Sequence, residues 1–128
     1  MIQPTTFRSS ATVLHDLDLG YNRLSYFEGL DLPQVRVLNI DHNNLTSLNR
    51  GQFAKMPQLI SLNVSYNDIN NVPSGIFRGL YRLRSIDLRS NSLTTLTFGI
   101  FDGLSNLRAV YLQDNAIKVI KHENVCHI

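Results

Sequence analysis

The sequence predicts an α/β-type solenoid, an arc of stacked coils with short parallel β-strands on its concave face and irregular or 3-10 turns on its convex face. Two observations lead to this prediction. An eleven-residue apolar pattern containing an asparagine occurs five times, at steps of 21, 24, 24 and 24 residues. A glycine–x–phenylalanine triplet recurs between the later copies, also at a step of 24 residues. Such periods are typical of proteins built from one repeated supersecondary unit.

Each copy of the eleven-residue pattern reads L-x-x-L-x-L-x-x-N-x-L, with Val or Ile in place of some leucines. The apolar pair before the asparagine, such as Ile86 and Leu88, alternates with polar neighbours, which indicates a short strand with one buried face. Stacked copies would place these strands side by side at roughly 4.8 Å, so we expect a parallel sheet. The copies span Leu14–Leu24, Val35–Leu45, Leu59–Ile69, Leu83–Leu93 and Leu107–Ile117.

The asparagine of each copy lies where the chain must turn out of the strand. Its amide group both donates and accepts hydrogen bonds, so it can satisfy backbone groups that the turn leaves unpaired. We therefore expect a hydrogen-bonded structural ladder beneath the sheet. Its members are Asn22, Asn43, Asn67, Asn91 and Asn115.

The second half of each repeat predicts a column of stacked phenylalanines under the convex side. We expect Phe7 to join this column from a partial first repeat. The first full repeat is three residues short and has no phenylalanine in register, so we expect Phe27 or Leu30 to fill the gap. The regular members of the column are Phe53, Phe77 and Phe101.

Composition and charge exclude several classes of partner. The chain has 128 residues, a formal net charge of +2 and scattered basic residues, so we expect no nucleic-acid partner. No apolar stretch approaches the roughly 18 residues that a membrane helix requires, so we expect no membrane insertion within this segment. The first ten residues lack the charged-then-apolar pattern of a secretory signal.

These repeats resemble the leucine-rich repeat family, specifically the 24-residue class of Toll-type receptor ectodomains, proteoglycan cores and insect immune factors. The resemblance covers the chain from about Phe7 to Ile120. It implies a single repeat domain over 1–128 that recognises a ligand outside the cell, as a secreted protein or a receptor ectodomain in innate immunity or cell adhesion. We expect a partial repeat at 1–13 and full repeats at about 14–34, 35–58, 59–82, 83–106 and 107–128.

The sequence departs from the family pattern at its ends. Cysteine-rich caps, which family members usually carry, are not expected here, because Cys126 is the only cysteine. Cys126 is compatible with a truncated cap, with a buried apolar role and with an intermolecular disulfide. Glu123 and Val125 replace the glycine and phenylalanine of the last repeat. Because an uncapped solenoid exposes its core at both ends, we expect a fragment of a longer receptor, or ends covered by a partner chain.

Solenoids of this shape bind through their concave face, where outward strand positions form columns. One expected column contains His15, Arg36, Ile60, Arg84 and Arg108, and another contains Gly20, Asp41, Ser65, Arg89 and Gln113. Tyrosines and a histidine share a third column and predict an aromatic ridge, since tyrosine is enriched in interface hot spots. Arginines around an aspartate predict a basic cluster for carboxylates or glycans. The expected ligand-binding residues are Tyr21, Arg36, His42, Tyr66, Arg84, Asp87, Arg89, Arg108 and Tyr111.

The simpler interpretation of these columns is that exposed strand positions are polar for solubility alone. An arginine beside an aspartate then forms only a weak cross-strand pair. Two glycosylation acceptors also occur, Asn44 in Asn-Leu-Thr and Asn63 in Asn-Val-Ser. A glycan at Asn44 would be harmless, whereas one at Asn63 would obstruct the concave sheet.

No catalytic or cofactor motif is present, so we expect no enzyme activity, no cofactor and no metal site. His122, Cys126 and His127 lie close together, but a structural zinc site normally takes four ligands. The leading function is therefore recognition of a protein or glycan ligand. Two alternatives remain open: a structural module that pairs with itself or a sister chain, and an intracellular repeat adaptor.

Overall fold

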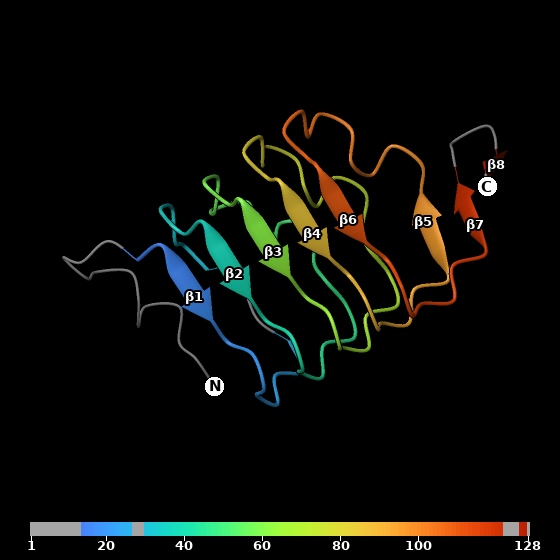
Figure 1. Cartoon of the computed structure of the whole chain (residues 1–128), viewed down its shortest axis with the longest axis horizontal. Helices are drawn as coiled ribbons and strands as arrows, with labels where there is room; N and C mark the ends of the chain where they lie inside the picture. Colours follow the sequence, from blue (N-terminus) through green and yellow to red (C-terminus); the bar gives the residue numbers. More distant parts are fainter. Residues whose placement is uncertain (1–13, 27–29, 122–125, 128) are drawn as a thin grey trace.

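The computed structural model describes residues 14–26, 30–121 and 126–127. Its main element is a parallel sheet of five three-residue strands, one from each coil, which lie side by side along one face (Figure 1). This confirms the predicted solenoid. The strands, in spatial order, are β1 (Asp16–Asp18), β2 (Val37–Asn39), β3 (Ser61–Asn63), β4 (Ser85–Asp87) and β6 (Ala109–Tyr111).

The register of the sheet follows the sequence repeat residue by residue. Leu38 pairs with Leu62, and Leu62 pairs with Ile86, so the central residue of each strand stacks on its equivalent. These three side chains are buried, while the strand residues on either side are more exposed. A strand with one buried residue between two outward residues is the period-2 pattern that the repeat predicts.

One hydrophobic core runs through the stacked coils. Leu88 is fully buried and Phe101 is partly buried against the core, as the repeat predicts. Phe77 stacks with its ring centroid 6.5 Å from that of Phe53 and 5.8 Å from that of Phe101, which confirms the phenylalanine column. Leu30 is buried in the short repeat, whereas Phe7 and Phe27 lie outside the described residues.

The convex side consists of tight turns, as expected. The backbone N–H of Met56 donates to the carbonyl of Phe53 at 3.0 Å, and Leu80 donates to Phe77 in the same way at 3.2 Å. Gly79 lies in this second turn with a φ of +86°, a left-handed conformation that glycine adopts without steric cost. These turns carry each coil back towards the next strand.

Asparagines link the coils through the backbone at four of the five predicted ladder positions, whereas Asn22 is exposed and bonds only to carbonyls of its own coil. The Nδ2 of Asn67 donates to the carbonyl of Ile40 in the preceding coil at 3.0 Å, while its Oδ1 accepts from the N–H of Leu45 at 3.0 Å. Asn67 is 6% exposed, so these bonds satisfy polar groups that water does not reach. The same two types of bond recur at Asn43, Asn91 and Asn115.

A second sheet was not predicted. It comprises β5 (Thr95–Thr97), β7 (Val119–Lys121) and β8 (Cys126–His127), with β5 parallel to β7 and β7 antiparallel to β8. Leu96 is buried between two exposed threonines, a strand pattern rich in β-branched residues. One coil earlier, the equivalent segment ends in Pro73, which has no N–H to donate to a sheet. The sequence predicted only turns outside the concave sheet, so that prediction was incomplete.

Candidate functional site

The predicted aromatic ridge is present at the ends of the first three strands. The ring of His42 is stacked between two tyrosines, with its centroid 4.1 Å from that of Tyr21 and 4.3 Å from that of Tyr66. Each tyrosine ring is parallel to the histidine ring to within 10°. Tyr21 is 76% exposed and Tyr66 is 49% exposed. The ridge therefore presents aromatic surface to solvent in a fixed row.

The backbone holds the ridge in place. Tyr21, His42 and Tyr66 all have left-handed φ values, between 54° and 56°, which costs a bulky residue roughly 1–2 kcal/mol. Hydrogen bonds to the next coil offset this strain, because the N–H of His42 donates to the carbonyl of Ser65 and that of Tyr66 to the carbonyl of Arg89. Side-chain direction in the ridge thus follows from the stacking of the coils.

A buried carboxylate orients the central ring of the ridge. The Oδ2 of Asp41 lies 2.6 Å from Nδ1 of His42, and Asp41 is only 9% exposed. Its Oδ1 is buried and has no hydrogen-bond partner among the described residues. This oxygen lies against Gly20, where an added Cβ would approach it to 2.3 Å. Gly20 is therefore the residue that leaves room for the carboxylate.

The predicted basic cluster divides into a paired part and an unpaired part. Arg89 forms a forked ion pair with Asp87, with Nη2–Oδ2 at 2.6 Å and Nε–Oδ1 at 3.0 Å. The guanidinium also lies over the ring of Tyr111, 5.3 Å from its centroid. The hydrogen bond to Asp87, followed by the attraction of its charge, raises the pKa of Arg89 above the ordinary value. The guanidinium of Arg89 is thus held in one direction, and the Asp87 carboxylate already balances its charge.

The arginines before the strands lie at a different place from the one predicted. Arg36, Arg84 and Arg108 were placed in an outward strand column, but each strand begins one residue later. Their backbone groups join the coils, as when the N–H of Arg108 donates to the carbonyl of Arg84 at 2.8 Å. Their exposed side chains border the face at the start of the strands. The missed outward column contains Asp16, Val37, Ser61, Ser85 and Ala109.

A second expected column is partly buried rather than outward. Asp41 and Ser65 are 9% and 2% exposed. The N–H of Ser65 donates to Oδ1 of Asn63 at 2.9 Å, and its hydroxyl donates to the same oxygen at 2.6 Å. The bond from its hydroxyl holds the short Ser65 side chain against the strand. Arg89 makes the same backbone bond, to Oδ1 of Asp87 at 3.1 Å, but its longer side chain is exposed, so only part of this column is buried.

Sequence reasoning missed Arg82. Together with Arg84, Ile60 and Asn106, it lines a hollow of about 180 Å³ at the strand-start border. Within the described parts of the chain, Arg82, Arg84 and Arg108 have neither an ion pair nor a side-chain hydrogen bond. Arg82 lies in the turn that the bond from the N–H of Leu83 to the carbonyl of Leu80 closes, just before the strand, so the strand pattern of the repeat did not indicate it.

Two glycosylation candidates have different surroundings. Asn44 is exposed, whereas the Asn63 amide lies in β3, half-buried and bonded to Ser65. Cys126 lies in β8 opposite Lys121, but its side chain is outside the described set, as are His122, Glu123 and Val125. Among described residues, no group of three or more His, Cys, Asp or Glu side chains is arranged to hold a metal ion. No helix in the described ranges is long and apolar enough to cross a membrane.

Comparison with known proteins finds both a family and a solved structure that share this repeat. The leucine rich repeat family matches residues 27–69 and 59–117. Among solved structures, the crystal structure of a TLR13–ssRNA13 complex matches with a TM-score of 0.77 and 32% sequence identity. That match covers 81% of this chain and 15% of the receptor chain, so the present chain spans a small part of its length. A comparison with curated proteins found no match.

The matched residues include His42 and Tyr66 of the ridge, four of the five ladder asparagines and the three regular phenylalanines of the column, and they leave out Tyr21 and Asn22. The chain therefore belongs to the leucine-rich repeat family and resembles Toll-type receptor ectodomains.

Proposed function

We propose that this chain is a non-catalytic recognition module that binds a protein or glycan ligand through its concave face. We place it outside the cell, in a secreted protein or a receptor ectodomain of innate immunity or cell adhesion. Membership of the family and similarity to a Toll-type receptor support this proposal. The observation that carries it is the stacked, exposed ridge of Tyr21, His42 and Tyr66.

The ridge suits binding because its order is established before a ligand arrives. Immobilising a flexible side chain on binding costs about 0.5–1.5 kcal/mol, and stacked rings with fixed backbones have little of this freedom to lose. Tyrosine also combines apolar area with a hydroxyl that donates or accepts a hydrogen bond. These properties fit both a protein surface and the faces of sugar rings.

The strand-start border adds charge to this surface. The ridge lies at the strand ends of the first three coils, while Arg82, Arg84 and Arg108 lie at the strand starts of the last two. Residues 84 to 90 would span about 20 Å if fully extended, so the face between the two borders is narrower than this. A suitable ligand would have an acidic end that meets the arginines and an apolar or sugar end that meets the aromatic ridge.

The experiment is a binding screen with matched tyrosine variants. The chain would be tested on an array of acidic and neutral glycans and on a panel of purified extracellular protein domains. We expect Tyr21→Ala with Tyr66→Ala to weaken the hits, and Tyr81→Ala to leave them unchanged. Tyr81 is a suitable control because it is 62% exposed and lines a hollow with the convex-side Gly79 and Gly103. Equal losses in both variants would reject the concave ridge as the binding surface.

Single-stranded RNA is a second candidate ligand. The matched receptor structure is a complex with ssRNA13, and bases stacked on aromatic side chains gain about 1–3 kcal/mol each. The small net charge argues against it, since backbone attraction dominates nucleic-acid affinity. Fluorescence anisotropy with a labelled single-stranded RNA at low and high salt decides between the ligands. Salt-sensitive binding that disappears in the Tyr21→Ala, Tyr66→Ala variant would favour RNA over a protein or glycan.

The assembly alternative concerns Cys126, which lies in the last strand of the second sheet. Size-exclusion chromatography with light scattering, with and without reductant, tests it directly. A dimer that disappears with reductant, and is absent from Cys126→Ser, would support pairing through this cysteine. The adaptor alternative differs in compartment and would be favoured by a chain that carries no glycan when it passes through a eukaryotic secretory pathway.

A further inference from the structure

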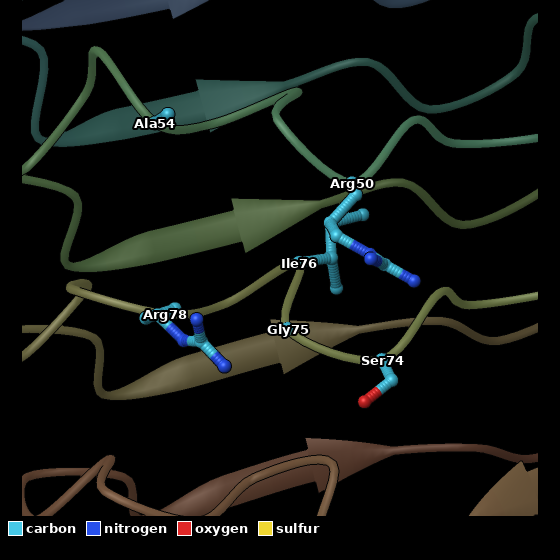
Figure 2. A pocket seen from close by; sticks show the side chains of 6 residues that line it. All are labelled: Arg50, Ala54, Ser74, Gly75, Ile76 and Arg78. Atoms are coloured by element: carbon cyan, nitrogen blue, oxygen red, sulfur yellow. The ribbon is translucent and has the colours of Figure 1, made fainter.

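We infer that the convex side carries a binding site for a tetrahedral oxyanion, a sulfate or phosphate group, between the coils of Arg50 and Arg78. The site is separate from the concave face and does not depend on the proposed function. Figure 2 shows Arg50 and Arg78 on either side of Gly75, with Ser74 next to it. The hollow that these residues border measures about 360 Å³, more than ten times the roughly 30 Å³ share of one liquid water molecule.

Two arginine side chains from adjacent coils pass close to one glycine, Gly75, which contacts the guanidinium of Arg78 and the aliphatic stem of Arg50. The Nη2 of Arg78 lies 3.8 Å, and Cδ of Arg50 3.9 Å, from the point that a Cβ on Gly75 would occupy. Both side chains are exposed, and neither has an ion pair or hydrogen bond with any part of the chain that the structure describes. Like charges in neighbouring coils repel, so a bound anion would convert this repulsion into two charge-assisted contacts.

The turn beside the arginines supplies neutral donors. The N–H of Ile76 donates to the carbonyl of Pro73 at 3.3 Å, and Gly75 has a φ of +82°, which defines a type II turn. The N–H groups of Ser74 and Gly75 and the hydroxyl of Ser74 have no acceptor among the residues placed in the structure. Free backbone N–H groups beside guanidinium forks are the donor set that binds sulfate and phosphate groups in proteins.

One acidic residue opposes the site. Asp102 is the equivalent of Arg78 in the next coil, 24 residues later, and lines an adjoining hollow with Gly75 and Arg78. Its carboxylate is turned towards Gly99, with Oδ2 2.9 Å from the position of an added Cβ, and within the described chain it makes no ion pair with Arg78. Its charge nevertheless lowers the local attraction for an anion. Removal of that charge should therefore strengthen anion binding.

The test is an NMR titration of the full chain, followed at the amide resonances of Ser74 and Gly75. Sodium phosphate and sodium sulfate would be compared with sodium chloride at equal ionic strength. We expect saturable shifts with phosphate and sulfate, about tenfold weaker binding in Arg50→Ala with Arg78→Ala, and stronger binding in Asp102→Asn. Arg23→Ala with Lys118→Ala removes the same charge at two other exposed positions and should leave the titration unchanged.

The source of the oxyanion is resolved by two further probes. Tighter binding of a sulfated disaccharide than of glycerol phosphate would assign the site to a glycan sulfate, and the reverse would assign it to a phosphate monoester. The inference is overturned if neither inorganic ion gives a saturable shift in the millimolar range. It is equally overturned if chloride gives the same shift, or if the control variant weakens binding as much as the Arg50→Ala, Arg78→Ala variant.

Discussion

The imidazole of His42 lies parallel to the phenol ring of Tyr66, with centroids 4.3 Å apart and planes within 9°. This spacing is close to the roughly 4.8 Å between neighbouring strands, so the sheet itself sets the distance between the rings. Both residues also share a left-handed backbone conformation. The geometry of the ridge is thus a consequence of coil stacking, and any change that disturbs the stacking should disturb the ridge.

Shortening a core side chain should destabilise the whole arc. Leu62 is 1% exposed and Phe77 is 2% exposed, so alanine at either position leaves a cavity between coils. We expect a loss of about 2–5 kcal/mol in the free energy of unfolding, measured by urea denaturation. Tyr81→Ala, at an exposed site, should cost little. An unchanged midpoint in Leu62→Ala would contradict the buried placement.

Removal of a ladder asparagine should cost about as much as a core cavity. Asn67→Ala leaves the buried N–H of Leu45 without a partner and removes one of the two bonds to the carbonyl of Ile40, which Asn43 still satisfies. We expect the unsatisfied group and the lost bonds together to cost about 2–4 kcal/mol. Asn71 is exposed and makes no side-chain bond within the described chain, so Asn71→Ala is the matched control. Similar unfolding midpoints for the two variants would show that the ladder does not join the coils.

The close approach of Gly20 and Asp41 predicts a coupled pair of substitutions. Gly20→Ala places a Cβ 2.3 Å from Oδ1 of Asp41, so the variant should lose about 1–3 kcal/mol of stability as the carboxylate is displaced. When Asp41→Ala is also present, the added methyl group no longer meets the Asp41 carboxylate. The double variant should therefore lose less stability than the two single variants lose in sum. Strict additivity in the thermal or urea unfolding data would argue against the contact.

The two glycosylation acceptors should behave differently. Asn44 is exposed, whereas the amide of Asn63 accepts bonds from Ser65 within the sheet. In folded protein secreted from a eukaryotic host, we expect mass spectrometry to find a glycan at Asn44 and none at Asn63. Asn44→Gln should then remove all N-linked mass from these two acceptors. A glycan recovered on Asn63 would show that this part of the concave face is covered.

The sequence predicted those features that depend on the same residue type recurring at the same position of every repeat. Leucines, asparagines and phenylalanines at fixed positions recur every 24 residues, and each pairs with its own copy in the next coil. The ridge followed from the same rule, because residues one repeat apart must be neighbours in space. The repeat period alone was therefore sufficient to predict the stacking of the coils, the ladder, the phenylalanine column and the ridge.

The features that were missed depend on local differences between copies. Strands of only three residues leave Arg84 at a border, and the bond from the Ser65 hydroxyl to Asn63 holds an expected outward side chain against the strand. The second sheet exists where threonines at Thr95–Thr97 replace a segment that ends in Pro73 one coil earlier. Such effects arise from hydrogen-bond geometry within one coil, which the average repeat pattern does not describe.

The coils stack in register, with Ser61 and Ser85 as outward neighbours whose hydroxyls lie 3.2 Å apart. A cysteine pair tests this register, in a chain that carries Cys126→Ser to remove the native thiol. We predict that Ser61→Cys with Ser85→Cys forms a disulfide under mild oxidation, because adjacent strands lie within the Cα separation of about 4.4–6.8 Å that a disulfide spans. Ser61→Cys with Ala109→Cys, two strands apart, should not form one. Equal cross-linking of both pairs, or none of the first, would contradict the stacked register on which the ridge and the recognition surface depend.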